Sequence, residues 1–197
     1  MSTLSALKKP PVTPSAAPVL IGLIGAGIAA SRTPLMHERE GERLGLRYIY
    51  RKLDTDSLRA DAPLADILQY AEFMGFTGLN VTYPFKQQIL PLLDELSENA
   101  RAVGAVNTVV FRDGRRFGHN TDIWGFAQGF RTSLPGVARE RVLQIGAGGA
   151  GAAVAHALMA EGVGALALYD TDTARAKDLA DDLCQRFGAG RAYVADD

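Results

Sequence analysis

The chain has 197 residues, a formal net charge of −1 and 47% hydrophobic residues, a composition typical of a packed globular protein. This net charge differs from the basic charge of nucleic-acid binders. No apolar run is long enough to span a membrane, and the single cysteine, Cys184, excludes an internal disulfide. Prolines stand near the start where a secretory signal has an apolar stretch, so we interpret residues 1–18 as a flexible tail. Together these features predict a cytoplasmic protein without nucleic-acid or membrane partners.

The first part of the chain alternates strand-like apolar runs with helical patterns. Val19–Gly25 ends in glycine and predicts a buried strand. Pro34 suits the first position of a helix that has Thr33 as its cap and ends near Gly45. The elements expected next are strands over 47–53 and 77–81, helices over 63–74 and from Pro84 and Pro91, a strand over 105–111 with a hairpin to 116–119, and a helix over 122–130.

The remainder of the chain has a β-α-β-α-β pattern. Residues 132–140 contain Pro135 and Gly136 and are the predicted domain boundary. Beyond it we expect strands over 141–145, 165–169 and 192–195 and helices over 149–161 and 173–187. Successive strand–helix units of this kind form a parallel sheet through right-handed crossovers, so the sequence predicts an α/β fold.

A glycine-rich hexapeptide follows the strand over 141–145 and opens the next helix. It consists of Gly146, Ala147, Gly148, Gly149, Ala150 and Gly151 and satisfies the G-x-G-x-x-G pattern of a dinucleotide pyrophosphate site. Asp170 ends the next strand, where a carboxylate binds ribose hydroxyls and repels a 2′-phosphate, so NAD is favoured over NADP. Arg175 could reach such a phosphate and keeps NADP open. The alternative is a glycine loop that serves packing alone.

A second glycine pattern, at residues 25–30, also follows a strand, and Asp54 lies a plausible distance beyond it. However, no helix opens at its second glycine, because Ser31, Arg32 and Thr33 precede the natural first helical residue. We therefore expect these glycines to clear space for a ligand near Ser31 and Thr33 rather than to bind a nucleotide. The three histidines are scattered without ligand spacing, so no metal site is predicted.

Four polar side chains stand out against apolar surroundings. Asn80 and Asn107 lie in strand-like segments, where they are either satisfied core residues or ligands of a polar molecule. Lys86 is the only charge in VTYPFKQQIL, and in the first turn of a helix a cation opposes the dipole, which favours a catalytic base over a surface lysine. Asp122 is either a helix-start acid or the partner that orients Lys86.

Five spaced motifs together resemble the shikimate dehydrogenase family: SRTP at 31–34, NVTYPFK at 80–86, GAVNT at 104–108, GHNTD at 118–122 and GAGGAG at 146–151. Thr33 and Asp170 are similar to the quinate/shikimate branch, which prefers NAD. The resemblance implies that Lys86 and Asp122 are catalytic. It implies substrate contacts for Ser31, Thr33, Asn80, Thr82, Lys86, Asn107 and Asp122.

The resemblance also implies a domain organisation and an activity. Residues 19–131 would form an α/β substrate domain with a mostly parallel sheet, 132–140 a linker, and 141–197 the first half of a Rossmann dinucleotide-binding domain, truncated at its C-terminal side. The implied reaction is reversible hydride transfer between NAD(P) and shikimate, quinate or their 3-dehydro forms. A homodimer is a possible assembly. The alternatives are a non-catalytic binding or sensor protein and a two-domain dehydrogenase for another small acid.

Overall fold

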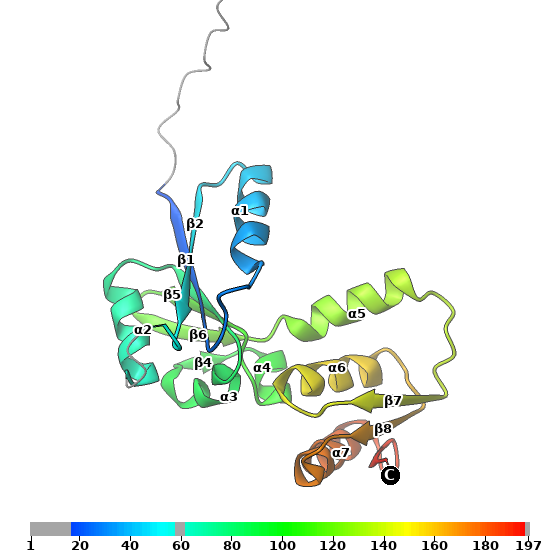
Figure 1. Cartoon of the computed structure of the whole chain (residues 1–197). Coiled ribbons are helices and arrows are strands. Elements are labelled where there is room, and N and C mark those ends of the chain that lie inside the picture. The colour runs from blue at the N-terminus through cyan, green and yellow to red at the C-terminus, as the bar shows by residue number, and fades with distance from the viewer. Residues whose placement is uncertain (1–16, 58–61, 196–197) are drawn as a thin grey trace, which may run out of the picture.

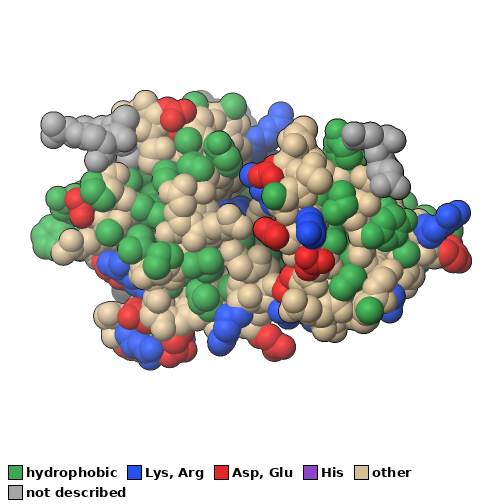
Figure 2. Space-filling model, turned by 90° about the horizontal axis from the view of Figure 1, so that it is seen from below, with side chains coloured by type: hydrophobic (Ala, Val, Ile, Leu, Met, Phe, Trp, Pro, Cys, Tyr) green, Lys and Arg blue, Asp and Glu red, His purple; other side chains and the backbone are tan. Residues whose placement is uncertain are grey.

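Apolar strands form two sheets, one in each of two lobes, in the computed structural model of the chain (Figure 1). The structure describes residues 17–57 and 62–195, so almost all of the predicted tail lies outside the described residues. No helix among these residues is both long and apolar enough to cross a bilayer. Acidic and basic side chains alternate over the face seen from below, without a region of one sign (Figure 2).

The first sheet has six strands in the order β2-β1-β3-β5-β6-β4. They are β1 (Val19–Gly25), β2 (Tyr48–Asp54), β3 (Gly78–Val81), β4 (Glu95–Leu96), β5 (Thr108–Arg112) and β6 (Arg115–His119). β2 and β3 run parallel to β1, and β4 runs parallel to β6, whereas β5 is antiparallel to β3 and β6. The carboxyl ends of β1 and β3 therefore lie side by side, at the kind of edge where α/β sheets bind ligands.

The helices of the first lobe are α1 (Thr33–Arg43), α2 (Leu64–Phe73), α3 (Phe85–Gln88), α4 (Glu98–Val103) and the 3-10 turn η1 (Leu90–Leu92). The interior between sheet and helices contains fully buried aliphatic side chains such as Ile24, Leu68, Leu79 and Ile89. The predicted hairpin is confirmed, because Asp113 and Gly114 both have positive φ and join β5 to β6. α4 was not predicted, although Ser97 caps it and Gly104 ends it in the left-handed conformation.

Two local predictions in this lobe are wrong, on the cap of α1 and on Asn107. Helix α1 begins at Thr33 itself, so Thr33 is not the cap; its backbone N–H donates to Ser31 Oγ at 3.3 Å. The helices expected from Pro84 and Pro91 are present, each as a single turn. Asn107 precedes β5 rather than lying inside it, since its own N–H and C=O bond to His119 and Val81 at the end of neighbouring strands.

The second lobe contains a parallel three-stranded sheet in the order β7-β8-β9. Its elements are β7 (Arg141–Ile145), α6 (Gly149–Ala160), β8 (Ala165–Tyr169), α7 (Thr173–Phe187) and β9 (Ala192–Val194). This order and parallel direction confirm the predicted β-α-β-α-β unit. Seven of the twelve residues of helix α6 are buried, since small alanines allow it to pack closely between its neighbours.

Helix α5 (Asp122–Ser133) joins the lobes and packs along α6 (Figure 1). Ile123, Phe126 and Phe130 of α5 pack against the core of the second lobe. Val103 and Ala105 of the first lobe belong to that same core. The helix runs into the predicted 132–140 boundary, and the division of the chain into domains stays a prediction.

Candidate active site

The ammonium of Lys86 and the carboxylate of Asp122 meet at the junction of the lobes. Lys86 Nζ donates to Asp122 Oδ2 at 2.6 Å, and the two side chains are 18% and 35% exposed. Lys86 comes from α3 and Asp122 from the first turn of α5, 36 residues later. The structure therefore brings together the pair that the sequence singled out, while their chemical role stays a prediction.

The helix dipole, which the sequence suggested as the cause of the reactivity of Lys86, is weak in this structure. Helix α3 has four residues, and such a short helix has few aligned peptide dipoles. The carboxylate of Asp122 is instead the nearest charge to the ammonium. We conclude that Asp122 fixes the position of Lys86, and that the helix dipole contributes little.

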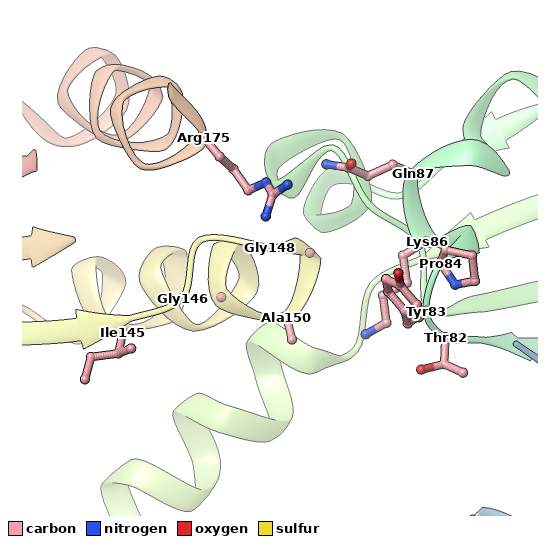
Figure 3. Close-up of a pocket in the computed structure, with 12 residues that line it drawn as sticks. Thr82, Tyr83, Pro84, Lys86, Gln87, Ile145, Gly146, Gly148, Ala150 and Arg175 are labelled. Atoms are coloured by element: carbon pink, nitrogen blue, oxygen red, sulfur yellow. The ribbon is translucent and has the colours of Figure 1, made fainter. Parts of the chain in front are cut away.

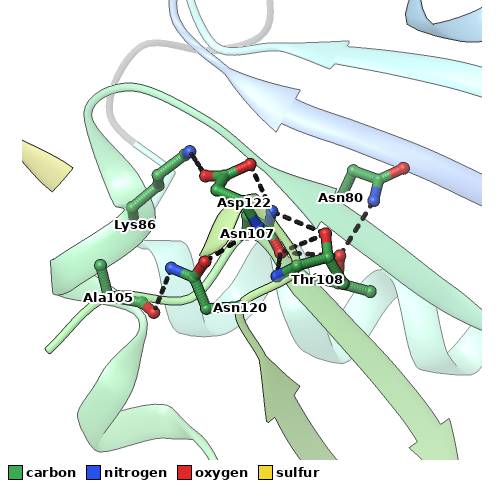
Figure 4. A network of polar contacts seen from close by, with 8 residues as sticks. Asn80, Lys86, Ala105, Asn107, Thr108, Asn120 and Asp122 are labelled. Carbon is green, nitrogen blue, oxygen red and sulfur yellow. Dashed lines mark hydrogen bonds and ion pairs between the residues drawn. The ribbon is translucent and has the colours of Figure 1, made fainter. Parts of the chain in front are cut away.

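A network of hydrogen bonds extends from Asp122 into the first sheet (Figure 4). Asn107 Nδ2 donates to Asp122 Oδ1 at 2.8 Å and to Thr121 Oγ1 at 2.9 Å. Asn107 Oδ1 accepts from Thr108 Oγ1 at 3.0 Å, and Thr108 Oγ1 accepts from Asn80 Nδ2 at 3.3 Å. Because both amide hydrogens of Asn107 are used inside the protein, this side chain holds Asp122 here, and its predicted contact with ring hydroxyls stays a prediction.

The sequence did not indicate that Asn120 supports this network. Asn120 is 3% exposed, its Nδ2 donates to the Ala105 carbonyl at 3.0 Å, and its Oδ1 accepts from the backbone N–H of Asp122 at 3.0 Å. A buried asparagine with both ends satisfied orients the backbone that it bonds. The only signal in the sequence was its position beside Asp122 in GHNTD.

Ser31 lies in the loop after β1 and Thr33 begins helix α1, and their hydroxyls are 3.0 Å apart. This loop lies against the one that follows β3. Ala26 N–H donates to the Tyr83 carbonyl at 2.9 Å, and Thr82 N–H donates to the Ile24 carbonyl at 3.0 Å. The structure thus places the loop carrying Ser31 and Thr33 next to the segment carrying Thr82 and Lys86.

The glycine loop at 146–151 has the geometry of a pyrophosphate site. Helix α6 opens directly after Gly148, and a Cβ on Gly146 or Gly148 would meet nothing within 4 Å. A Cβ on Gly151 would lie 2.2 Å from the Gly146 carbonyl oxygen, so only glycine allows the helix this close to the loop. Open space in front of a helix N-terminus fits an anionic ligand such as a dinucleotide pyrophosphate.

Asp170 holds the same loop from the end of β8. Its Oδ2 accepts from Ala147 N–H at 2.6 Å and its Oδ1 from Asp172 N–H at 2.9 Å. These backbone donors, Ala147 first, lower the pKa of the carboxyl below its ordinary value. Arg175 lies nearby, with Nη1 3.7 Å from Asp170 Oδ1.

Gln144 supports the loop from within the fold and was missed in the sequence. It is 8% exposed, and its Nε2 donates to the carbonyls of Gly146 and Gly151 at 2.8 and 2.9 Å. A polar residue in an otherwise apolar strand was the available signal. Its Oε1 is buried without a partner among the described residues.

A cleft of about 490 Å³ separates the segment that carries Lys86 from the glycine loop at 146–151 (Figure 3). One wall consists of Thr82, Tyr83, Pro84, Lys86 and Gln87, and the other of Ile145, Gly146, Gly148, Gly149, Ala150, Gly151 and Arg175. The side chain of Lys86 lies close to Gly149, because a Cβ there would be 3.6 Å from Lys86 Cδ. No cluster of three or more potential metal ligands occurs among the described residues.

Comparison with known proteins agrees with this arrangement. Residues 23–109 match the model of the shikimate dehydrogenase substrate binding domain. The chain is 51% identical to a shikimate dehydrogenase (NADP(+)) of Streptomyces avermitilis, over 89% of the chain and 61% of the relative, and 51% identical to a quinate/shikimate dehydrogenase (NAD(+)) of Corynebacterium efficiens, over 90% and 63%.

Similarity to a solved structure extends across both lobes. The quinate dehydrogenase from Corynebacterium glutamicum in complex with NAD superposes with a TM-score of 0.85 at 48% identity, covering 91% of this chain and 64% of that one. The chain thus spans about three fifths of the length of these relatives. The motifs, the fold and these similarities agree: residues 23–109 match the substrate binding domain of the shikimate dehydrogenase family, and the likeness to shikimate and quinate/shikimate dehydrogenases extends over both lobes.

Proposed function

We propose that this chain supplies the substrate site, the proton-transferring pair and the pyrophosphate loop of an NAD(P)-dependent dehydrogenase acting on shikimate or quinate. The observation that carries the proposal is the position of Lys86 and Asp122 across one cleft from the glycine loop 146–151. Hydride transfer requires a hydroxylated substrate, a nicotinamide and a proton acceptor within a few ångströms of one another. A cleft bounded by Lys86 on one side and by this glycine loop on the other supports the proposal.

The substrate site in this proposal lies at the carboxyl ends of β1 and β3. The paired hydroxyls of Ser31 and Thr33 donate to the substrate carboxylate, as two donors 3.0 Å apart suit the two oxygens of one acid. Asn80 and Thr82, on the adjacent strand end and loop, bind ring hydroxyls. Asn107 keeps Asp122 in place beside them.

Lys86 is the acid–base group of the proposed reaction. Its Nζ, as the neutral amine, takes the proton of the substrate hydroxyl during oxidation, and the ammonium formed returns that proton to the ketone oxygen during reduction. Asp122 Oδ2 accepts a hydrogen bond from the same nitrogen and keeps it directed towards the substrate. A nicotinamide dinucleotide, when bound, accepts or supplies the hydride.

Among the two nicotinamide cofactors, we propose that NAD is preferred. The supporting feature is the carboxylate of Asp170, which lies against Ala147 of the pyrophosphate loop and would repel a 2′-phosphate. Arg175 is the group that would favour NADP, but it is within 4 Å of two carboxylates, Asp170 and Asp172. These carboxylates compete with a phosphate for its charge.

The decisive experiment is substitution of Lys86 by alanine. With shikimate or quinate and either cofactor, Lys86→Ala should lower kcat by a factor of about 10²–10⁴ with little change in KM, because acid–base catalysis acts on the transition state. The assay is reduction of the nicotinamide cofactor followed at 340 nm, in the chain itself and in the chain extended to the length of its relatives. Lys177→Ala, an exposed lysine on α7, is the matched control.

The possible results separate three functions. Unchanged turnover by Lys86→Ala would show that this lysine is not the acid–base group. Binding of shikimate or quinate by calorimetry, without turnover by either form of the chain, would indicate a binding protein. Absence of binding of both acids would indicate a dehydrogenase for another substrate.

A further inference from the structure

Tyr50 stands at the far end of the hydrogen-bond network that holds Asp122. It is 8% exposed in the middle of β2, and its hydroxyl donates to Asn80 Oδ1 at 2.6 Å. Burial raises the pKa of this phenol well above its ordinary value, so the group is a neutral O–H donor at neutral pH. None of the five sequence motifs includes Tyr50.

The direction of every bond in the network follows from its acidic end. A carboxylate paired with an ammonium can only accept, so the group of Asn107 that faces Asp122 is its NH₂ and the group that faces Thr108 is its carbonyl oxygen. The hydroxyl hydrogen of Thr108 is therefore used, and Thr108 Oγ1 must accept from the NH₂ of Asn80. The carbonyl oxygen of Asn80 is then left for the hydroxyl of Tyr50.

This direction leaves one hydrogen of Asn80 available. One N–H of its amide bonds to Thr108, and the second has no acceptor among the described residues. We propose that Tyr50 is a positioning residue for ligand binding: it fixes the amide of Asn80 so that this second N–H donates to a hydroxyl oxygen of a cyclic polyhydroxy acid. Without the phenol O–H, only the bond to Thr108 holds the amide, which can then swing away from the ligand position.

A second contact connects Tyr50 to the loop proposed to bind the carboxylate. The ring of His37 lies against the ring of Tyr50, with centroids 4.9 Å apart, and His37 Nδ1 lies 3.0 Å from the Thr33 carbonyl. A carbonyl only accepts, so Nδ1 carries the hydrogen. Tyr50 thus lies between the loop carrying Ser31 and Thr33 and the amide of Asn80, and it sets the spacing of the two ligand contacts.

The inference rests on the proposed substrate class, and a double-variant cycle tests it. The dissociation constants of shikimate and quinate are measured by calorimetry for the 197-residue chain and for Tyr50→Phe, Asn80→Ala and the double variant. Tyr50→Phe should weaken binding about tenfold, the range expected for losing one buried hydrogen bond. In the Asn80→Ala background the same substitution should change the dissociation constant by less than about twofold, since the amide it orients is gone.

Tyr48→Phe is the matched control, because Tyr48 lies two residues away on the same face of β2 and packs on Gly41. It should leave affinity unchanged. Tyr50→Phe binding as tightly as the parent chain would overturn the inference alone, and so would equal weakening in both backgrounds, which indicates a general structural role. A parent chain that binds neither acid would overturn the proposed function together with the inference.

Discussion

The two glycine loops of this chain are each anchored by an aspartate and differ in the space around their glycines. Each follows a strand, and each is held by a carboxylate at the end of the next parallel strand. Asp54 accepts from Gly27 N–H at 3.0 Å, and Asp170 accepts from Ala147 N–H at 2.6 Å. The residue two positions after each aspartate also donates to it.

What differs is the space around the glycines. A Cβ on Gly25 would lie 2.4 Å from Thr82 Cγ2 and 3.1 Å from the Tyr83 carbonyl oxygen, so protein atoms fill the position. A Cβ on Gly148 would meet nothing within 4 Å. The G-x-G spacing that both loops share therefore has two uses: the first loop lets two segments of the protein pack, and the second leaves a cavity beside a helix N-terminus.

The largest expected effect is a difference between the two loops in how much an added methyl group lowers the stability of the protein. Gly25→Ala should lower the free energy of unfolding by about 1–3 kcal/mol, because the added methyl group overlaps packed atoms. Gly148→Ala should change it by less than about 0.5 kcal/mol and should weaken nucleotide binding instead. Urea denaturation measures the first quantity and calorimetry with NAD the second. Equal loss of stability at both positions would remove the distinction.

A somewhat smaller effect is expected at the aspartate of the first loop. Asp54→Ala should lower the free energy of unfolding by about 1–2 kcal/mol, since Gly27 and Asp56 lose a buried acceptor. Both backbone groups donate to one atom, Oδ1, so Asp54→Asn can keep both bonds and should cost much less. Similar urea midpoints for the two variants would show that charge, rather than this oxygen, stabilises the loop.

The aspartate of the second loop should affect cofactor choice. Asp170→Asn should shift the ratio of NADP to NAD affinity towards NADP by roughly tenfold, because a negative charge near a 2′-phosphate is removed. The ratio is measured by calorimetry with both dinucleotides, and Asp181→Asn, an exposed residue of α7, is the control. A constant ratio would mean that Asp170 acts only on the loop backbone.

The smallest expected effect is a pH dependence of stability that comes from the helix after the second loop. Helix α1 buries only Gly41, whereas α6 buries seven residues, including His156. Burial lowers the pKa of His156 below 6.5, although Asp182, 3.1 Å away, opposes the shift. The unfolded chain then binds the proton more readily, so stability is retained above pH 6.5 and falls as the pH decreases below it. Thermal unfolding from pH 7.5 to 5 should show this decline, and His156→Gln should reduce it while His119→Gln should not.

The sequence predicted the second lobe better than the first. The bounds of β7, β8 and α7 agree with the structure because each is a regular run bounded by glycine, proline or a capping aspartate. In the first lobe, Asn107 was assigned to a strand because it adjoins β-branched residues, but its backbone bonds to two different strands place it before β5. The local sequence pattern does not show where a strand begins when that point is set by hydrogen bonds to residues far away in the chain.

The candidate site shows the same limit. Lys86 and Asp122 could be selected individually, because a lone charge in an apolar segment and an acid at a helix start are visible in the sequence. Tyr50 could not, since a tyrosine in a strand is ordinary and its partner Asn80 is 30 residues away. Roles that depend on the partner's position in space became visible only in the folded chain.

The shared interior of the two lobes restricts how the cleft can open. Ala105, which follows the last turn of α4, is buried in one cluster with α6, and a Cβ on Gly149 would lie within 3.7 Å of both Ala105 and Lys86. A hinge that swung the pyrophosphate loop away from the lysine would have to pull this tightly packed cluster apart. Lys86 and the pyrophosphate loop are therefore expected to move together when ligands enter or leave the cleft.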